Sequence, residues 1–311
     1  MDPIRALVDM HGFFTWGEAH DVGYDDRDVA RFVRGKQWMR FRRGFYTLPD
    51  HWAALDDTGR HLLRAHAVLR SLGEGVVLSH VSAAIAHGIS VWGLPLDLVH
   101  VTRLDGGAGR TEAGVVHHEG FTLDDDVTKL DGKPVTTPDR AALEAASLGD
   151  GEAALCTLDS VLHESLCTEP ALHRRFELMA HWPGKRHLHV PLRMADGRAE
   201  SVGESRGRWL CWSYHLPAPE PQFEVRDADG RLLGTCDWGW PRHGVLGEFD
   251  GRVKYGRLVA PDQEAGDVVF AEKQREDLLF EVTGYRMFRA VWSDYDRPRV
   301  TAARLSRLLG C

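Results

Sequence analysis

The chain has 311 residues, which is long for a single hydrophobic core and predicts two or three domains. Hydrophobic residues make up 43% and charged residues 27%, an ordinary globular composition that excludes a disordered or fibrous chain. No apolar stretch approaches the roughly 20 residues that span a bilayer, and the first residues lack the apolar core of a signal peptide. We therefore expect a cytoplasmic protein with no membrane partner.

The formal net charge of −8 does not exclude a nucleic-acid partner, because binding depends on local patches of charge. The five cysteines form no C-x-x-C pair, which argues against a disulfide framework and a cysteine-bound zinc ion. Among the 17 histidines, the pairs His117–His118 and His80–His87 are candidates for metal binding, and core or solvent-exposed histidines are the simpler interpretation.

Residues 1–50 predict three short helices followed by a β-hairpin. Apolar positions at helical spacing give a first helix that ends at Gly12. Thr15 with Glu18 forms a capping-box pattern for a second helix, and Asp25 or Asp26 caps a third. Two aromatic-rich runs flank Gly44 as the strands of a hairpin. This order of elements is that of a winged helix-turn-helix.

Seven basic residues and one acid, Asp28, lie between residues 27 and 43. The basic residues are Arg27, Arg31, Arg34, Lys36, Arg40, Arg42 and Arg43. The first three recur on one helical face, so the third helix could enter the major groove while the hairpin reaches phosphates. We predict DNA binding; a solvated basic face on a structural domain is the alternative.

The segment HGFFTWGEAHDVGYDDRDVARFVRGKQWMRFRRGFYTLP resembles the N-terminal domain of the AbiEi family of antitoxins from type IV toxin–antitoxin systems. The resemblance implies a winged DNA-binding domain that represses its own operon. LSHVSAAIAHGI and VTTPDRAALEAAS resemble the middle region of the same family. We expect this middle region to be a structural α/β module that contacts a protein partner such as a cognate toxin.

The last third of the chain predicts an α-β-β-β-α-β order of elements. The predicted helices cover residues 201–214 and 268–282, and the predicted strands cover 221–226, 231–237, 244–250 and 285–291. This order is the core of the PD-(D/E)XK nuclease fold.

Three acids fall where phosphodiester hydrolysis needs them. Asp237 ends the second strand, and Glu248 and Asp250 share one face of the third. If these two strands pair antiparallel through a turn over residues 238–243, Asp237 lies close to Glu248. Converging carboxylates repel unless a divalent cation neutralises them, and oxygen ligands favour Mg²⁺ or Mn²⁺. Turn or surface acids are the alternative.

The segments GESRGRWL, GTCDWGWP, GEFDGRVKY and AEKQREDLLFEVTGYRMFRAVW resemble the small endonucleases related to very-short-patch mismatch repair. The resemblance implies that Asp237 and Glu248 bind metal, that Asp250 assists, and that Glu204 lies in the outer shell of the metal site. The motif's lysine is replaced by Asp250, so Lys254 or Lys273 is expected to take over its phosphate contact.

Arg275 lies in the apolar stripe of the predicted helix over 268–282, where an ionised group needs a carboxylate partner. Two interpretations stay open. Its partner is Glu272 on the same helix, or Arg275 reaches the acidic cluster or the phosphate. The tryptophans Trp209, Trp212, Trp238 and Trp240 are predicted to be core residues.

The sequence thus predicts an α/β (α+β) multidomain protein. Residues 1–52 form the winged helix-turn-helix, 53–195 the middle α/β module, and 196–311 a restriction-endonuclease-like domain. The leading functional hypothesis is a DNA-binding protein with a Mg²⁺-dependent endonuclease domain, acting in phage defence or a toxin–antitoxin locus. The alternative is a non-catalytic antitoxin-type transcriptional repressor with a degenerate nuclease fold.

Overall fold

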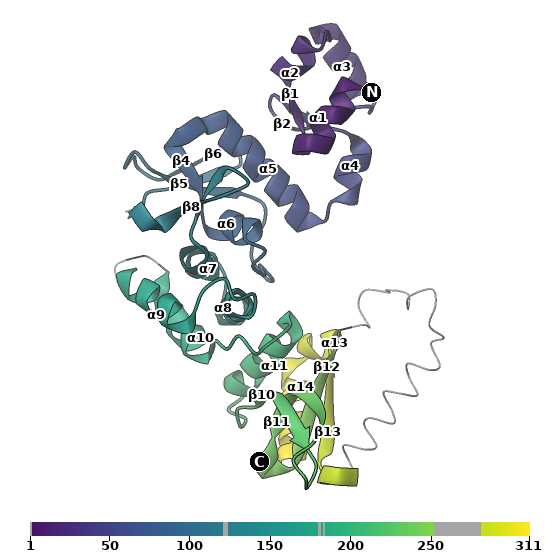
Figure 1. Ribbon diagram of the computed structural model, residues 1–311, viewed down its shortest axis with the longest axis vertical. Coiled ribbons are helices and arrows are strands. Elements are labelled where there is room, and N and C mark those ends of the chain that lie inside the picture. The colour runs from purple at the N-terminus through teal and green to yellow at the C-terminus, as the bar shows by residue number, and fades with distance from the viewer. Residues whose placement is uncertain (1, 121–123, 180–181, 183, 252–280) are drawn as a thin grey trace. The chain divides into compact units, whose positions relative to one another are not determined.

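The structure is a computed structural model that describes residues 2–120, 124–179, 182, 184–251 and 281–311 (Figure 1). It is an α+β protein whose contacts divide the chain into two compact units. The first unit comprises Met1–Asp150 and Pro170–Arg186, and the second comprises Gly151–Glu169 and His187–Cys311.

The first unit begins with the predicted helices and hairpin. They are α1 (Pro3–His11), β1 (Phe14–Thr15), α2 (Trp16–Asp21), α3 (Asp26–Arg34), β2 (Met39–Arg42) and β3 (Phe45–Thr47), with the strands in the order β1-β3-β2. Both predicted caps are confirmed, because Thr15 with Glu18 and Asp25 with Asp28 each form a complete capping box. Phe14 and Trp38 pack edge to face at 4.8 Å between ring centroids in the core beneath these elements.

The rest of the first unit is a six-stranded mixed sheet with helices. The strands run in the order β6-β7-β5-β4-β9-β8, and among the described strand pairs of this sheet only β5–β7 and β4–β9 are parallel. They are β4 (Val76–Leu78), β5 (Val99–Arg103), β6 (Arg110–Glu112), β7 (Val115–His118), β8 (Val127–Leu130) and β9 (Lys133–Thr136). The helices are α4 (Pro49–Ala54), α5 (Asp57–Leu72), α6 (His80–Ala86), α7 (Pro138–Ala146) and α9 (Glu169–Leu178).

Valines of this sheet form one core with α5. Val76, Val101 and Val115 are buried in the same cluster as Ala65 and Val68 of the helix. Continuous apolar runs of this kind are typical of strands that are covered by other elements. The strand order β7-β5-β4 decides which residues meet at the ends of those strands.

The second unit contains a four-stranded sheet in the order β10-β11-β12-β13. Its elements are α8 (Gly151–His163), α10 (His189–Met194), α11 (Val202–Ser213), β10 (Glu220–Arg226), β11 (Leu232–Trp240), β12 (Val245–Asp250), β13 (Arg286–Val291), α13 (Trp292–Tyr295) and α14 (Pro298–Leu309). The first three strands pair antiparallel, and β13 pairs parallel with β12. The helix and the strands predicted around Glu204, Asp237 and Glu248 are confirmed. Most of the helix predicted over residues 268–282 lies outside the described residues.

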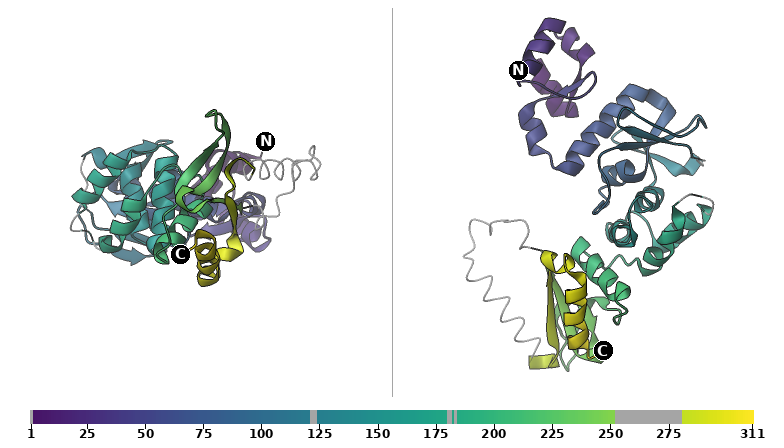
Figure 2. Two further views of the ribbon diagram at one scale, coloured as in Figure 1. Left: turned by 90° about the horizontal axis from the view of Figure 1, so that it is seen from below. Right: turned by 180° about the vertical axis from the view of Figure 1, so that it is seen from behind.

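Helix α11 lies directly against this sheet. A Cβ atom on Gly207 would sit 2.2 Å from the ring of Trp238, and one on Gly203 would sit 2.1 Å from the ring of Phe249. Two glycines one helical turn apart therefore allow the backbone of α11 to contact the aromatic core. Leu305 of α14 joins the same core, and Figure 2 shows α14 running along the sheet.

The prediction that the tryptophans are core residues is confirmed for two of them. Trp238 and Trp240 are 1% and 2% exposed, whereas Trp212 is 45% exposed and is not a core residue. By its contacts, α8 groups with the second unit, although the sequence division placed it in the middle module. Among the helices of the described residues, none combines the length and the apolar character required to cross a bilayer.

Candidate functional sites

The pairing of β11 with β12 brings two of the predicted acids together. The antiparallel ladder runs from Trp240↔Val245 to Trp238↔Gly247, and its extension by one residue places Asp237 opposite Glu248. Oδ2 of Asp237 accepts a hydrogen bond from the backbone N–H of Phe249 at 2.6 Å. The carboxylate of Asp237 thus binds a backbone N–H of β12 just beyond the last residue pair of the β11–β12 ladder. The predicted pairing is confirmed, and the turn is shorter than expected because β11 continues to Trp240.

Glu248 faces a cation that the sequence analysis did not single out. Arg289 lies opposite Glu248 in the parallel β12–β13 pair, and its Nη2 is 3.9 Å from Oε2 of Glu248. Asp250, two residues further along β12, is exposed. The strand period places it on the same face of the sheet as Glu248. The positive charge beside Glu248 therefore comes from the last strand of the sheet.

Glu204 is 4% exposed, and its carboxylate is engaged by groups of the protein. It accepts hydrogen bonds from the Ser201 hydroxyl (2.8 Å), the Glu200 N–H (3.0 Å) and the side-chain amide of Gln222 (2.9 Å). Burial raises the pKa of Glu204 above its ordinary value. These contacts give Glu204 a structural role at the N-terminal turn of α11.

Gln222 donates a hydrogen bond to Glu204 and lies in register with Asp237. The register of β10 with β11 puts Gln222 opposite Asp237, between Pro221↔Trp238 and Phe223↔Cys236. Its φ of 49° is a left-handed backbone conformation within a strand, which costs about 1–3 kcal/mol for a residue other than glycine. Gln222, Asp237, Glu248 and Arg289 thus occupy one row across the four strands.

The four predicted metal-binding acids do not form one compact group. Among the described residues, only His80, His100 and His118 form a set of at least three histidine, cysteine or acidic residues whose ligand atoms all lie within 4.8 Å of one another. Lys254, Lys273 and Arg275 lie outside the described residues. The predictions about their roles stay predictions.

Six of the seven basic residues of the winged helix are exposed. They are Arg27, Arg31, Arg34, Lys36, Arg40 and Arg43. Arg42 is different, because its Nη1 donates to the backbone carbonyl of Ala113 at 3.0 Å and burial lowers the pKa of its guanidinium. Arg42 therefore contacts the β6–β7 turn of the first unit and does not belong to the exposed basic surface.

The acids at the start of α3 have partners on the winged helix itself. Asp25 and Asp28 make the capping box, and Arg31 lies 2.6 Å from Asp28. Asp26 accepts a hydrogen bond from the indole N–H of Trp16 at 2.9 Å. Of the exposed cations, Arg31 is thus paired with an acid of its own helix.

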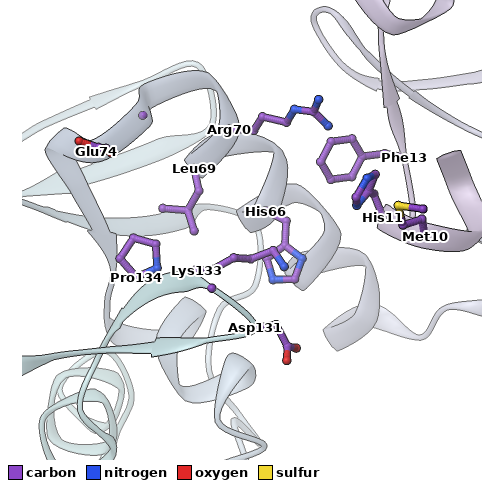
Figure 3. A pocket seen from close by; sticks show the side chains of 12 residues that line it. Met10, His11, Phe13, His66, Leu69, Arg70, Glu74, Asp131, Lys133 and Pro134 are labelled. Carbon is purple, nitrogen blue, oxygen red and sulfur yellow. The ribbon is translucent and has the colours of Figure 1, made fainter.

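A pocket of about 530 Å³ lies within the first unit (Figure 3). The end of α1, α5 and the β8–β9 turn line it together with Phe13, which precedes β1, and Arg70 lies over the ring of Phe13. Burial, with a contribution from Lys133, lowers the pKa of His66 to about 4. His66 is therefore neutral near pH 7.

The sequence analysis missed the histidine cluster as a group. His80 and His118 were each considered with a neighbour in sequence, and His100 was not considered. His100 and His118 lie in β5 and β7, and His80 lies two residues after the end of β4. The order of these strands in the sheet could not be predicted from the sequence.

Comparisons with known proteins find similar chains but identify no family. No family model matches the chain. It is 27% identical over 238 residues to the proteins MT2308 and Rv2248 of two Mycobacterium tuberculosis strains, both named as uncharacterized, covering 74% of this chain and 82% of each relative. The crystal structure of the M. tuberculosis protein RV2827C matches with a TM-score of 0.40 and 16% identity, over 72% of this chain and 82% of that one.

Proposed function

We propose that this protein binds DNA through its winged helix and hydrolyses DNA phosphodiester bonds with a divalent metal ion at Asp237 and Glu248. The observation that carries the proposal is the β11–β12 register, which sets these two carboxylates opposite each other where the ladder ends. The order α11-β10-β11-β12 and the parallel pairing of β13 with β12 also support the proposal, because the sequence resemblance implies this arrangement.

The donor set at this position fits Mg²⁺ or Mn²⁺. Proteins hold Mg²⁺ with as few as one or two carboxylates, and the substrate phosphate and water complete the coordination. Asp237 and Glu248 would be the two ligands, with the exposed Asp250 on the solvent side. A bound ion would polarise the scissile phosphate and make a bound water more acidic.

The neighbouring residues position these two carboxylates. The N–H of Phe249 fixes one oxygen of Asp237, and Arg289 places positive charge beside Glu248, where a phosphate would bring negative charge. Glu204 acts as a positioning residue, because its carboxylate already accepts three hydrogen bonds and holds Gln222 in the row.

DNA binding is supported by the exposed cations of α3 and the β2–β3 hairpin. Arg27, Arg31 and Arg34 recur along one face of α3, opposite the buried Val29, while Arg40 and Arg43 lie on the hairpin. Cations on a helix and on its adjacent hairpin match the docking of a helix in the major groove with the wing on the phosphates.

The second candidate function is a DNA-binding regulator without catalysis. Two observations favour it: Asp250 stands where the nuclease motif has lysine, and the four predicted acids do not form one group of ligands within the described part of the chain. In this case the sheet of the second unit is a scaffold, and a cognate protein partner remains a prediction.

Cleavage of supercoiled plasmid distinguishes the two functions. The purified protein is incubated with plasmid and Mg²⁺ or Mn²⁺, beside Glu248→Ala and the control Glu220→Ala, an exposed acid on β10. We expect metal-dependent nicking that Glu248→Ala reduces at least about 100-fold, consistent with removal of a group that stabilises the transition state, and that Glu220→Ala retains. No cleavage by the wild type, together with a gel shift on DNA upstream of its own gene, would establish the regulator.

A further inference from the structure

We propose that His80, His100 and His118 form a binding site for a first-row divalent transition-metal ion such as Zn²⁺. The three residues come from adjacent strands of the first unit. His80 follows β4 as the first residue of α6, His100 lies in β5, and His118 ends β7. In the sheet β5 lies between β7 and β4, so the fold brings together residues that are 18 to 38 positions apart.

The distances suit a common ligand after a small adjustment. All three ligand atoms lie within 4.8 Å of one another, and Nδ1 of His100 is 2.9 Å from Nε2 of His118. Two nitrogens bound to one tetrahedral Zn²⁺ lie about 3.3 Å apart, given Zn–N bonds of about 2.0–2.1 Å. The rings of His80 and His118 stack at 3.6 Å between centroids. Metal binding therefore replaces one imidazole–imidazole hydrogen bond and turns one stacked ring.

The cluster is in the protonation state that a metal requires. His80 and His100 are 8% and 6% exposed. Burial is the main cause that lowers the pKa of all three rings, that of His100 to about 3. A neutral imidazole offers a lone pair, and neutral imidazoles suit Zn²⁺, Cu²⁺, Fe²⁺ and Ni²⁺.

A buried carboxylate lies behind His80, as it does behind many ligating histidines. Glu144 of α7 accepts the backbone N–H of His80 at 3.1 Å, and its Oε2 is 3.6 Å from Nδ1 of that ring. Nδ1 also lies 3.1 Å from the Ser79 hydroxyl, so Nε2 is the ring atom left for a metal. Arg140 and Asp126 continue this buried network and hold Glu144 in place. Such partners fix the tautomer and orientation of a ligand.

Two local features single out this position. His80 has a φ of 50°, and left-handed backbone at a residue other than glycine is concentrated at functional sites. Thr102 is 1% exposed, pairs with His118 in register and shares a strand face with His100. Within the described part of the chain its hydroxyl has no hydrogen-bond partner. A water in the fourth position of the metal would give that hydroxyl one.

Metal titration of the full chain tests the site. The protein is stripped with a chelator, and Zn²⁺ binding is measured by calorimetry; Co²⁺ is then bound and its visible spectrum recorded. We expect one ion per chain that excess Mg²⁺ does not displace, and the intense absorption of tetrahedral Co²⁺. His100→Ala should weaken binding at least about 100-fold, and Glu144→Gln about 10- to 100-fold, as for outer-shell partners generally. His117→Ala is the matched control, because it removes the adjacent histidine of β7, whose side chain points to the other face.

The half-buried His118 provides a second variant if His100→Ala does not fold, as judged by circular dichroism. His118→Gln should also lose the ion and the Co²⁺ spectrum. Binding of equal strength in folded His118→Gln and wild type, or no stoichiometric binding by the wild type, would overturn the proposal. Excess Mg²⁺, which prefers oxygen ligands, should not displace Zn²⁺ from the three imidazoles, so failure of the nuclease proposal does not affect this test.

Discussion

The histidine cluster of the first unit and the carboxylate pair of the second differ in how the surrounding protein holds them. Three neutral imidazoles come from adjacent strands and are backed by a buried network of charges. Asp237 and Glu248 face each other at the open end of a strand pair, near solvent, with Arg289 at the side. The first arrangement is formed by the fold alone, whereas a metal ion at the second, as proposed, would keep coordination positions for a substrate.

The charge of the side chains accounts for this difference. Neutral nitrogen ligands do not repel one another, so they can cluster in the interior without an ion. Ionised carboxylates repel, and a site made of them stays open until a cation and a phosphate arrive. Substitutions at each site, and at the residues that contact it, test this difference.

The largest effect is expected for the charge network behind the histidines. Arg140 is 1% exposed and binds Glu144 at 2.8 Å and Asp126 at 2.5 Å. Arg140→Met leaves two buried carboxylates without this partner, which should lower the free energy of unfolding by about 3–5 kcal/mol. Urea denaturation measures this change in the free energy of unfolding. The control Arg226→Met breaks an exposed pair with Glu224 and should cost less than about 1 kcal/mol.

Acid should destabilise the first unit through its buried histidines. The pKa of His100 is about 3 in the folded protein and about 6.5 when unfolded, so its stabilising contribution is complete above pH 6.5 and is lost as the pH falls toward 3. Between pH 6.5 and 5.5 this residue alone should cost about 1 kcal/mol. Urea denaturation at both pH values should show a smaller loss for His100→Gln than for wild type. An equal loss would mean that His100 is not the group responsible.

A more modest effect is expected in the second unit at Glu204. Glu204→Gln keeps the shape of the side chain but replaces one of its acceptor oxygens by a donor, which disturbs the contacts with Ser201 and Gln222. Since this residue acts through its neighbours, plasmid cleavage should fall about 10-fold, or roughly 1.4 kcal/mol. Complete loss of cleavage, equal to that of Glu248→Ala, would make Glu204 a direct metal ligand.

The smallest effect concerns the winged helix. Arg31→Ala and Arg43→Ala should each weaken DNA binding several-fold and reduce the slope of log affinity against log salt by about 1. Arg42→Ala is the matched control on the same hairpin, because its guanidinium contacts Ala113. Fluorescence anisotropy at several salt concentrations measures both quantities. An equal change of slope for all three variants would show that Arg42 contacts DNA as Arg31 and Arg43 do, and would reject its exclusion from the basic surface.

The sequence predicted local structure well where side chains within a few residues determine it. The capping boxes at Thr15 and Asp25 are confirmed in full. Ser79 and Thr137 occupy the N-cap positions of α6 and α7, where residues of their type are typical, but neither makes a side-chain cap bond. Helices α13 and α14 were not predicted.

Features that depend on packing between distant segments could not be predicted. The partners Arg289 of Glu248 and Gln222 of Glu204 come from other strands and depend on the register of the sheet. Arg42 has the same spacing as its exposed neighbours, and only the contact with Ala113 distinguishes it. The histidine cluster depends on the strand order β7-β5-β4, which hydrophobic periodicity does not encode.

The close contact of α11 with the sheet has a consequence for the evolution of this chain. Gly207 and Trp238 share one volume, since a methyl group on the first would meet the ring of the second at 2.2 Å. Related sequences with a larger residue at 207 should therefore carry a smaller one at 238, and likewise for positions 203 and 249. Such paired substitutions would keep the helix that carries Glu204 at a constant depth while the aromatic core beneath it changes.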